Sequence, residues 1–224
     1  MARVLSVIKA DEMVQRDVEA ELRWDARLQP NEIGVTVAGG VATLTGRVDS
    51  LTKKWTAEEA VQRVRGVYAV ANEIEVHLPS FAERSDSDIA RAAVQALEWD
   101  ASVPREKIRI TVAQGLLTLT GEVEWQYQRR AAEDAVWRLM GVRGVDNRIT
   151  IRPAVAASGL ETKIEAALLR GALHDAHRVK VEVNGSEVIL RGSVRSWAEW
   201  QQAMGVAWSA PGVSVVDNRI SVAP

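Results

Sequence analysis

Internal repetition constrains this chain more than any other feature of its sequence. Segments TLTG, TLTG and ILRG end at Gly46, Gly121 and Gly192, so successive copies are offset by 75 and 71 residues. The same offsets relate two further sets of residues, Gly66, Gly141 and Gly212, and Asn72, Asn147 and Asn218. Agreement between independent landmarks makes coincidence implausible, and a fixed period is the signature of repeated structural units. We therefore predict three tandem modules over residues 11–79, 85–153 and 158–224.

Each copy shows the same succession of hydrophobic patterns. Apolar residues at helical spacing come first, as at Val14 and Val18. Two alternating runs follow, separated by a glycine-bearing turn that is typical of a hairpin. A second helix is expected to begin near Leu51, Trp125 and Trp197, and a last alternating run contains the repeated asparagine. The predicted fold class is α+β, with three αββαβ modules that each pack two helices on one face of a small three-stranded sheet.

Two residue types interrupt the apolar pattern of the strands. Gly46 falls on the same face as Leu44 and Val48, and we expect it to let a helix approach the sheet closely. Asparagine is disfavoured in strands, so the repeated asparagine is expected to make a structural hydrogen bond from its side chain to the adjacent loop or helix end.

Taken together, these features resemble the BON domain family, named for bacterial osmotically inducible protein Y and nodulation proteins. The resemblance rests on the αββαβ order, the (T/I)-L-(T/R)-G strand ending, the Gly-Val pairs and the V-x-N-x-I-x-(V/I) last strand. It covers nearly the whole chain, three times over. It implies a bacterial protein, related to osmotic stress or the envelope, that binds phospholipid or holds client proteins in a chaperone-like manner.

Charge and composition exclude several other classes of protein. Lys and Arg number 28 against 30 Asp and Glu, so no chain-wide basic field favours nucleic acid as a partner. With no cysteine, disulfides and thiolate chemistry are excluded. The apolar run near the N-terminus is too short for a signal peptide, so we expect a cytoplasmic protein, or a periplasmic one if an export signal was removed.

Catalytic and metal-binding constellations are not expected. His174 and His177 lie three residues apart beside Asp175, but no third ligand is evident, and a solvated loop is the better interpretation. The carboxylates of the predicted second helices are interpreted as solvated surface: Glu58, Glu59, Glu133 and Asp134. No nucleophile, base and orienting group recur together in the copies. We therefore expect no enzyme activity, no metal and no cofactor.

Tryptophan is the unusual component of the composition. The chain has eight Trp against one Phe and two Tyr, and five of the eight fall on or next to the second helices of copies 2 and 3. There they join methionines in an apolar stripe away from the predicted core face: Trp137, Met140, Trp197, Trp200, Met204 and Trp208. Such a stripe either packs against a neighbouring copy or a second chain, or forms a surface for a ligand, a client protein or a membrane.

The expected function is therefore binding, with phospholipid or protein clients as ligands and the stripe as the contact surface. A structural, self-associating protein is the first alternative. A sensor of small ions or ligands, bound by the loops between modules, is the second.

Overall fold

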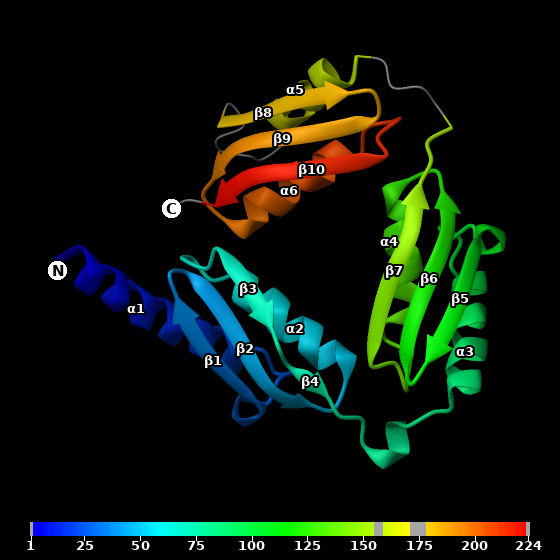
Figure 1. Cartoon of the computed structure of the whole chain (residues 1–224), viewed down its shortest axis with the longest axis horizontal. Helices are drawn as coiled ribbons and strands as arrows, with labels where there is room; N and C mark the ends of the chain where they lie inside the picture. The colour runs from blue at the N-terminus through cyan, green and yellow to red at the C-terminus, as the bar shows by residue number, and fades with distance from the viewer. Residues whose placement is uncertain (1, 155–158, 171–177, 223–224) are drawn as a thin grey trace. The chain divides into compact units, whose positions relative to one another are not determined.

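Three modules follow one another along the computed structural model, which describes residues 2–154, 159–170 and 178–222 (Figure 1). Module 1 contains α1 (Ala2–Trp24), β1 (Ile33–Ala38), β2 (Val41–Val48), α2 (Leu51–Gln62), β3 (Ala69–Asn72) and β4 (Glu75–Val76). Module 2 contains α3 (Asp86–Trp99), β5 (Ile108–Ala113), β6 (Leu116–Val123), α4 (Gln126–Val136) and β7 (Gly144–Ile151). Module 3 contains α5 (Leu160–Arg170), β8 (Val179–Asn184), β9 (Glu187–Val194), α6 (Trp197–Trp208) and β10 (Val215–Val222). Short 3-10 helices η1 (Pro30–Glu32), η2 (Ser80–Ala82) and η3 (Arg105–Lys107) lie between these elements.

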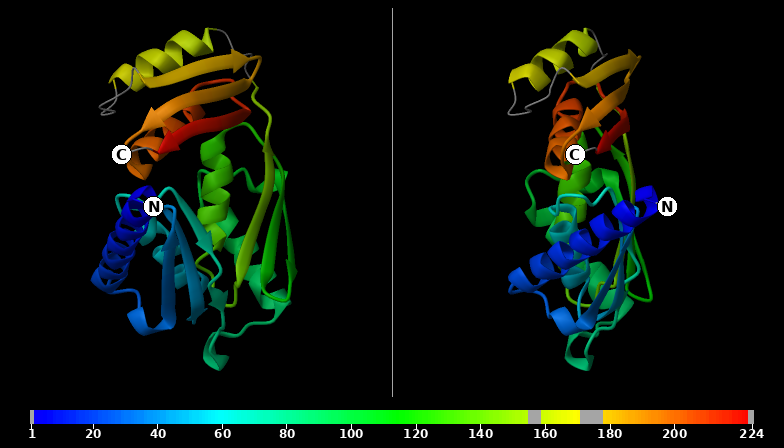
Figure 2. Two further views of the ribbon diagram at one scale, coloured as in Figure 1. Left: turned by 60° about the vertical axis from the view of Figure 1, so that its left-hand side comes forward. Right: turned by 90° about the vertical axis from the view of Figure 1, so that its left-hand side faces the viewer.

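Each module is built around a small mixed sheet. In module 2, β6 is the central strand, antiparallel to β5 and parallel to β7. In module 1, β3 and β4 together take the place of one parallel strand beside β2. A helix joins the second strand to the third because parallel neighbours need a crossover connection. Both helices of module 2 lie on one side of its sheet (Figure 2). The predicted fold class is therefore confirmed.

The hydrophobic core of each module forms between its helices and its sheet. In module 1, Val18 and Leu22 from α1, Leu44 from β2, and Ala60 and Val61 from α2 are at most 2% exposed. Equivalent buried positions in the other modules are Ile89, Ala93, Leu97, Leu119 and Val136, and Ile164, Leu168, Leu190, Ala203 and Ala207. Each fully buried Val, Leu or Ile side chain contributes about 1.5–3 kcal/mol to folding.

The first helix of module 1 is longer than the sequence pattern predicts. The pattern places the start of the module at residue 11, whereas α1 begins at Ala2. Nothing between Ala2 and Trp24 interrupts a helix, because this segment contains neither glycine nor proline.

The repeated glycine of the central strand serves a purpose different from the expected one. Gly46 is exposed and has φ +124°, and a Cβ atom there would lie 2.1 Å from the Glu32 carbonyl oxygen. Gly121 and Gly192 have the same geometry, against Lys107 and Arg178. The glycine therefore lets the chain just before the neighbouring strand approach closely, and it adopts a conformation that other residues avoid. The interpretation that it makes room for a helix is wrong.

Asn72 and Asn147 fasten the last strand of their modules to the second helix. Asn147 Nδ2 donates to the carbonyl of Arg129 (3.0 Å) and to Glu133 Oε2 (3.0 Å), and its Oδ1 accepts from the N–H of Ile149 (3.2 Å). Asn72 makes the same three bonds, with Lys54, Glu58 and Ile74. The predicted structural hydrogen bond is confirmed for both residues, and the second helix is the partner.

Module 3 does not have this connection. Asn218 still accepts from the N–H of Ile220 (2.9 Å), but its buried Nδ2 has no hydrogen-bond partner within the described part of the chain. The offset of 71 residues places Met204 where module 2 has Glu133, so the carboxylate acceptor is absent. A buried donor without an acceptor costs about 1–3 kcal/mol. Module 3 therefore forgoes an interaction that stabilises the other two.

Candidate functional site

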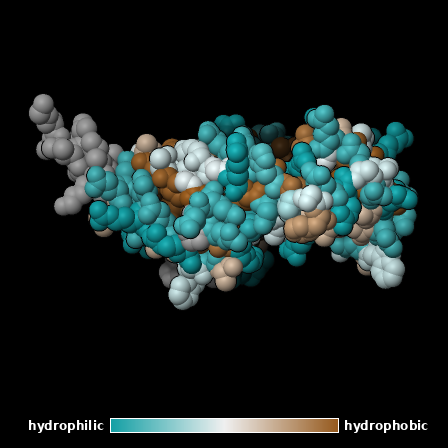
Figure 3. Space-filling model, turned by 90° about the horizontal axis from the view of Figure 1, so that it is seen from below, coloured by the Kyte–Doolittle hydropathy of each residue, from teal (hydrophilic) through white to brown (hydrophobic). Residues whose placement is uncertain are grey.

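Two tryptophans at equivalent places in modules 1 and 2 expose almost the whole indole. Trp24 ends α1 and is 84% exposed, and Trp99 ends α3 and is 83% exposed. The surface drawn in Figure 3 is mainly hydrophilic, and large aromatic side chains are seldom left this open to water. Reasoning from the sequence missed this pair because it followed stripes along the second helices. The signal was present, because the two residues are separated by the repeat offset of 75.

Polar contacts order the chain directly after each exposed indole. Arg27 donates from Nε and Nη2 to the two carboxylate oxygens of Asp25, at 2.9 and 2.7 Å. This hydrogen bonding lowers the pKa of Asp25 from 3.8 to about 2. In both modules the carboxylate also accepts from the backbone N–H two residues further on, Asp25 from Arg27 (3.0 Å) and Asp100 from Ser102 (2.8 Å). Each exposed indole therefore lies between the last turn of a helix and a hydrogen-bonded turn of the chain.

A second aromatic group, in which Tyr127 is exposed, lies at the same end of module 2. Trp125 is the N-cap of α4, and its ring stacks on that of Tyr127 with centroids 6.4 Å apart and planes 26° from parallel. Tyr127 is 58% exposed. The end of α3, the start of β5, the end of β6 and the start of α4 all lie at one end of the sheet (Figure 1). Trp99 ends α3 and Tyr127 lies in the first turn of α4, so both residues lie at this end.

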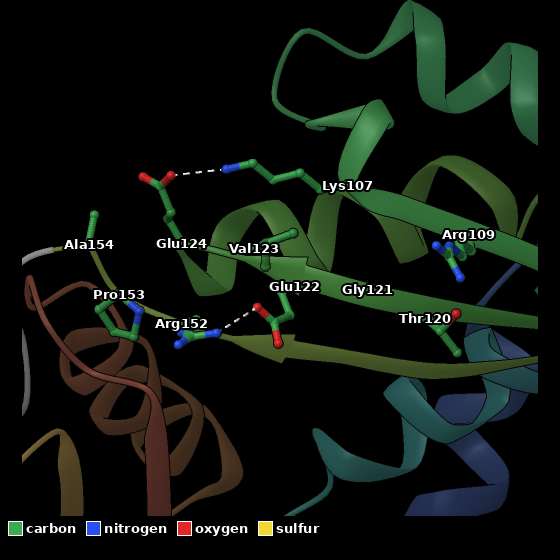
Figure 4. A pocket seen from close by; sticks show the side chains of 10 residues that line it. All are labelled: Lys107, Arg109, Thr120, Gly121, Glu122, Val123, Glu124, Arg152, Pro153 and Ala154. Atoms are coloured by element: carbon green, nitrogen blue, oxygen red, sulfur yellow. Dashed lines mark hydrogen bonds and ion pairs between the residues drawn. The ribbon is translucent and has the colours of Figure 1, made fainter.

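A hollow of about 670 Å³ opens on the sheet of module 2 at this end (Figure 4). It lies on the exposed side of β5 and β6 and reaches the residues that follow β7. Its charged lining consists of the cations Lys107, Arg109 and Arg152 and the carboxylates Glu122 and Glu124.

The charges around the hollow do not balance. Lys107 Nζ pairs with Glu124 Oε1 at 3.0 Å, and Arg152 Nη1 pairs with Glu122 Oε2 at 3.4 Å. No ion pair to Arg109 occurs among the residues that the structure describes. Arg109 is opposite Thr120 on the neighbouring strand, and the two side chains lie side by side in Figure 4. The hollow therefore has one cation in excess, next to a hydroxyl group.

The residues of the predicted stripe lie just after α4 and along α6. Trp137 is the C-cap of α4 and is 8% exposed, with the Arg138 guanidinium 4.8 Å from its ring centroid. Met140 follows it and is 51% exposed. The four residues of α6 are all half-buried: Trp197, Trp200, Met204 and Trp208. The use of this stripe as a contact surface stays a prediction.

The candidate metal ligands do not form a site in the part of the chain that is described. His174 and His177 lie outside the described residues. His77 Nε2 is 3.0 Å from Glu75 Oε2 at the surface of module 1. Over residues 2–154, 159–170 and 178–222, no three His, Cys, Asp or Glu side chains gather where they could hold a metal ion. The helices of those ranges include none that is both long and apolar enough to cross a bilayer.

Comparison with known proteins identifies each module. The family model described as BON domain matches residues 10–77, 85–153 and 156–224. The chain is similar to osmotically-inducible protein Y of Escherichia coli (strain K12), with 29% identity over 143 residues that cover 60% of this chain and 71% of that protein.

Two solved structures share a distant likeness with the chain. The secretion-system structural protein CdsD of Chlamydia trachomatis is 15% identical, with 93% of this chain and 91% of that chain covered and a TM-score of 0.25. The PrgH periplasmic domain is 11% identical, with 86% and 96% covered and a TM-score of 0.22. Likeness at this level supports no conclusion about function.

Proposed function

The chain belongs to the BON domain family, with three copies in tandem, and on that premise we propose that it is a non-enzymatic protein that binds phospholipid surfaces. The contact is made by the exposed indoles at the ends of modules 1 and 2. The observation that supports this proposal is the pair Trp24 and Trp99, which expose 84% and 83% of their surface at equivalent positions.

Indole chemistry explains why this arrangement suits a bilayer. Tryptophan combines a large apolar ring with an N–H donor, so it favours the boundary between lipid tails and water. An indole that is already exposed moves from water to that boundary without any rearrangement of the module. Tyr127, with its phenol group, has the same preference and lies at the same end as Trp99.

Vesicle binding tests the proposal. The full chain is mixed with vesicles of phosphatidylcholine and phosphatidylglycerol, and the bound fraction is measured by cosedimentation. We expect Trp24→Ser and Trp99→Ser each to weaken binding, and the double variant to weaken it most. Met13→Ser is the matched control because Met13 is an apolar residue of α1 that is 58% exposed. If both tryptophan variants bind as the control does, the indoles are not the contact.

Binding of protein clients is a second candidate function, and the α6 stripe supports it. Trp200, Met204 and Trp208 are large apolar side chains that keep part of their surface accessible. We propose that this stripe receives an apolar segment of a client. Trp200→Ser and Trp208→Ser are expected to reduce the ability of the chain to hold a denatured test protein in solution, with the thermal transition retained. Loss of the transition would show that the stripe is structural, and a change in sedimentation would indicate self-association.

The cellular setting belongs to the same proposal. On this view the chain works at a membrane surface, and fractionation of the cells that produce it distinguishes cytoplasm from periplasm. The name of the Escherichia coli relative refers to osmotic induction. We propose the same setting for this chain, measured as its abundance after a shift to high osmolarity.

A further inference from the structure

We propose that the hollow on the sheet of module 2 binds the phosphate group of an anionic phospholipid headgroup, an inference that rests on the proposed attachment to phospholipid. Lys107, Arg109 and Arg152 supply positive charge around it, and Thr120 supplies a hydroxyl donor. These residues lie at the end of module 2 that also bears Trp99 and Tyr127. One end of a single module therefore combines groups for the headgroup with groups for the apolar boundary.

Arg109 is the centre of this site. Two of the three cations are already paired, Lys107 with Glu124 and Arg152 with Glu122. Arg109 has no acidic partner in the described ranges, so a phosphate oxyanion brings the charge that the lining lacks. A guanidinium group presents its N–H donors as a fork that matches two phosphate oxygens.

The strand register places a second donor beside the guanidinium. Arg109 on β5 is directly opposite Thr120 on β6, and both side chains leave the exposed face of the sheet. The Thr120 hydroxyl can donate to a phosphate oxygen that Arg109 holds. The two ion pairs border the hollow, and their cations, which are partly exposed, add long-range attraction.

Module 1 lacks the central cation of this site, whereas module 3 has Arg178 and Lys180 at the positions of Lys107 and Arg109. The offset of 75 residues places Gly34 where module 2 has Arg109 and Glu32 where it has Lys107. Thr45 takes the place of Thr120, so the hydroxyl is retained while the central cation is absent.

The test compares two arginines of module 2 in the full chain. Arg109→Ala removes the proposed ligand, and Arg130→Ala removes an equal charge from α4, where Arg130 is paired with Asp134 and exposed. Binding is measured to vesicles of phosphatidylcholine with and without phosphatidylglycerol. We expect Arg109→Ala to lower the preference for the anionic vesicles about fivefold or more, as for a basic group at the bilayer surface, and Arg130→Ala to lower it less. If the two substitutions lower the preference for anionic vesicles equally, the proposed phosphate site is wrong.

Two further arms separate the remaining outcomes. If the wild-type chain binds neither kind of vesicle, the proposed function itself fails. If it binds both kinds equally and Arg109→Ala changes nothing, attachment stands and the phosphate site fails. Glycerol phosphate is titrated against the chain without vesicles, and Arg109 is followed by NMR. Saturation of that signal at micromolar glycerol phosphate would assign the hollow to a soluble phosphate compound and overturn the lipid headgroup as its occupant.

Discussion

Asp86, in the first turn of α3, accepts a hydrogen bond at 2.9 Å from the backbone N–H of Gly115, which lies 29 residues further along in the turn between β5 and β6. The other carboxylate oxygen accepts from the N–H of Gln114, also at 2.9 Å. Asp11 holds Gly39 and Gly40 of module 1 in the same way, at 2.7 and 3.0 Å. One carboxylate thus joins the first helix to the hairpin turn in two modules.

Removing this carboxylate should loosen the hairpin. Asp86→Ala leaves two turn N–H groups without their charged acceptor. A hydrogen bond to a charged group contributes about 1.5–3 kcal/mol to stability. We expect the free energy of unfolding to fall by about 2 kcal/mol, measured by urea denaturation of the full chain. Asp134→Ala, an exposed carboxylate of α4, should change it by less than about 0.5 kcal/mol. An equal loss in the two variants contradicts the role given to Asp86.

The hydrogen bond between Asn147 and Glu133 can be tested by adding its equivalent to module 3 and by removing it from module 2. In module 3 the equivalent of Glu133 is Met204, and Asn218 Nδ2 is buried without an acceptor within the described residues. Met204→Glu should supply the acceptor and slow the hydrogen exchange of β10, because a charge-assisted bond replaces an orphan donor. Met204→Leu is the control, since it keeps the side chain apolar. Unchanged exchange in Met204→Glu would show that α6 cannot bring a carboxylate to Asn218.

The reverse change in module 2 should destabilise it. Glu133→Ala takes away one of the two acceptors of Asn147 Nδ2, while the carbonyl of Arg129 remains. We expect a loss of about 1 kcal/mol in the free energy of unfolding. Differential scanning calorimetry of Glu133→Ala and Glu133→Gln measures it, and the glutamine variant, which keeps a carbonyl acceptor, should lose less.

Two glycines of module 1 distinguish the cost of an unfavourable backbone conformation from the cost of a steric clash. Both have positive φ, but a Cβ atom at Gly39 meets nothing within 4 Å, whereas one at Gly46 meets the Glu32 carbonyl oxygen at 2.1 Å. Gly39→Ala should cost about 1–2 kcal/mol from its backbone conformation alone. Gly46→Ala should cost at least about 3 kcal/mol, because the strain is joined by a clash with backbone. Thermal denaturation that shifts equally in both variants would contradict this assignment.

Acid should weaken module 1 through Asp25. The bonds from Arg27 hold the pKa of Asp25 at about 2 in the folded chain, below its ordinary 3.8. A carboxylate with a lowered pKa stabilises the fold above its ordinary value, and this contribution is lost as the pH falls from about 4 towards 2. Carboxyl NMR should show Asp25 titrating near 2 in the wild-type chain and near the ordinary value in Arg27→Gln. Identical titration curves would mean that Arg27 does not cause the shift.

The order of elements could be predicted from the sequence because each copy repeats the same hydrophobic periods. Val18 and Leu22 have helical spacing and are buried, and Leu44 has strand spacing and is buried. The role of Gly46 could not be predicted in the same way. Alternation assigns a side of the sheet to each residue, but it contains no information on φ or on how near the neighbouring chain passes.

The candidate site was only partly accessible to such reasoning. Trp24 and Trp99 share the repeat offset, but the exposure of a residue at a helix end depends on the loop that follows it, which periodicity does not describe. The hollow around Arg109 brings together residues of β5, of β6 and of the segment that follows β7, and their neighbours are set by the register of these strands. Lys107, Arg109 and Arg152 show no common pattern along the chain.

The glycine near the end of each central strand limits how far the three copies can differ. Residues 46, 121 and 192 all have positive φ with a carbonyl oxygen where a methyl group would stand, so no other residue fills this position without strain. Around that fixed position the copies differ, with an arginine in the second where the first has a glycine, and a methionine in the third where the others have a glutamate. A chain with three copies of one indispensable strand glycine can thus present three different surfaces on a single fold.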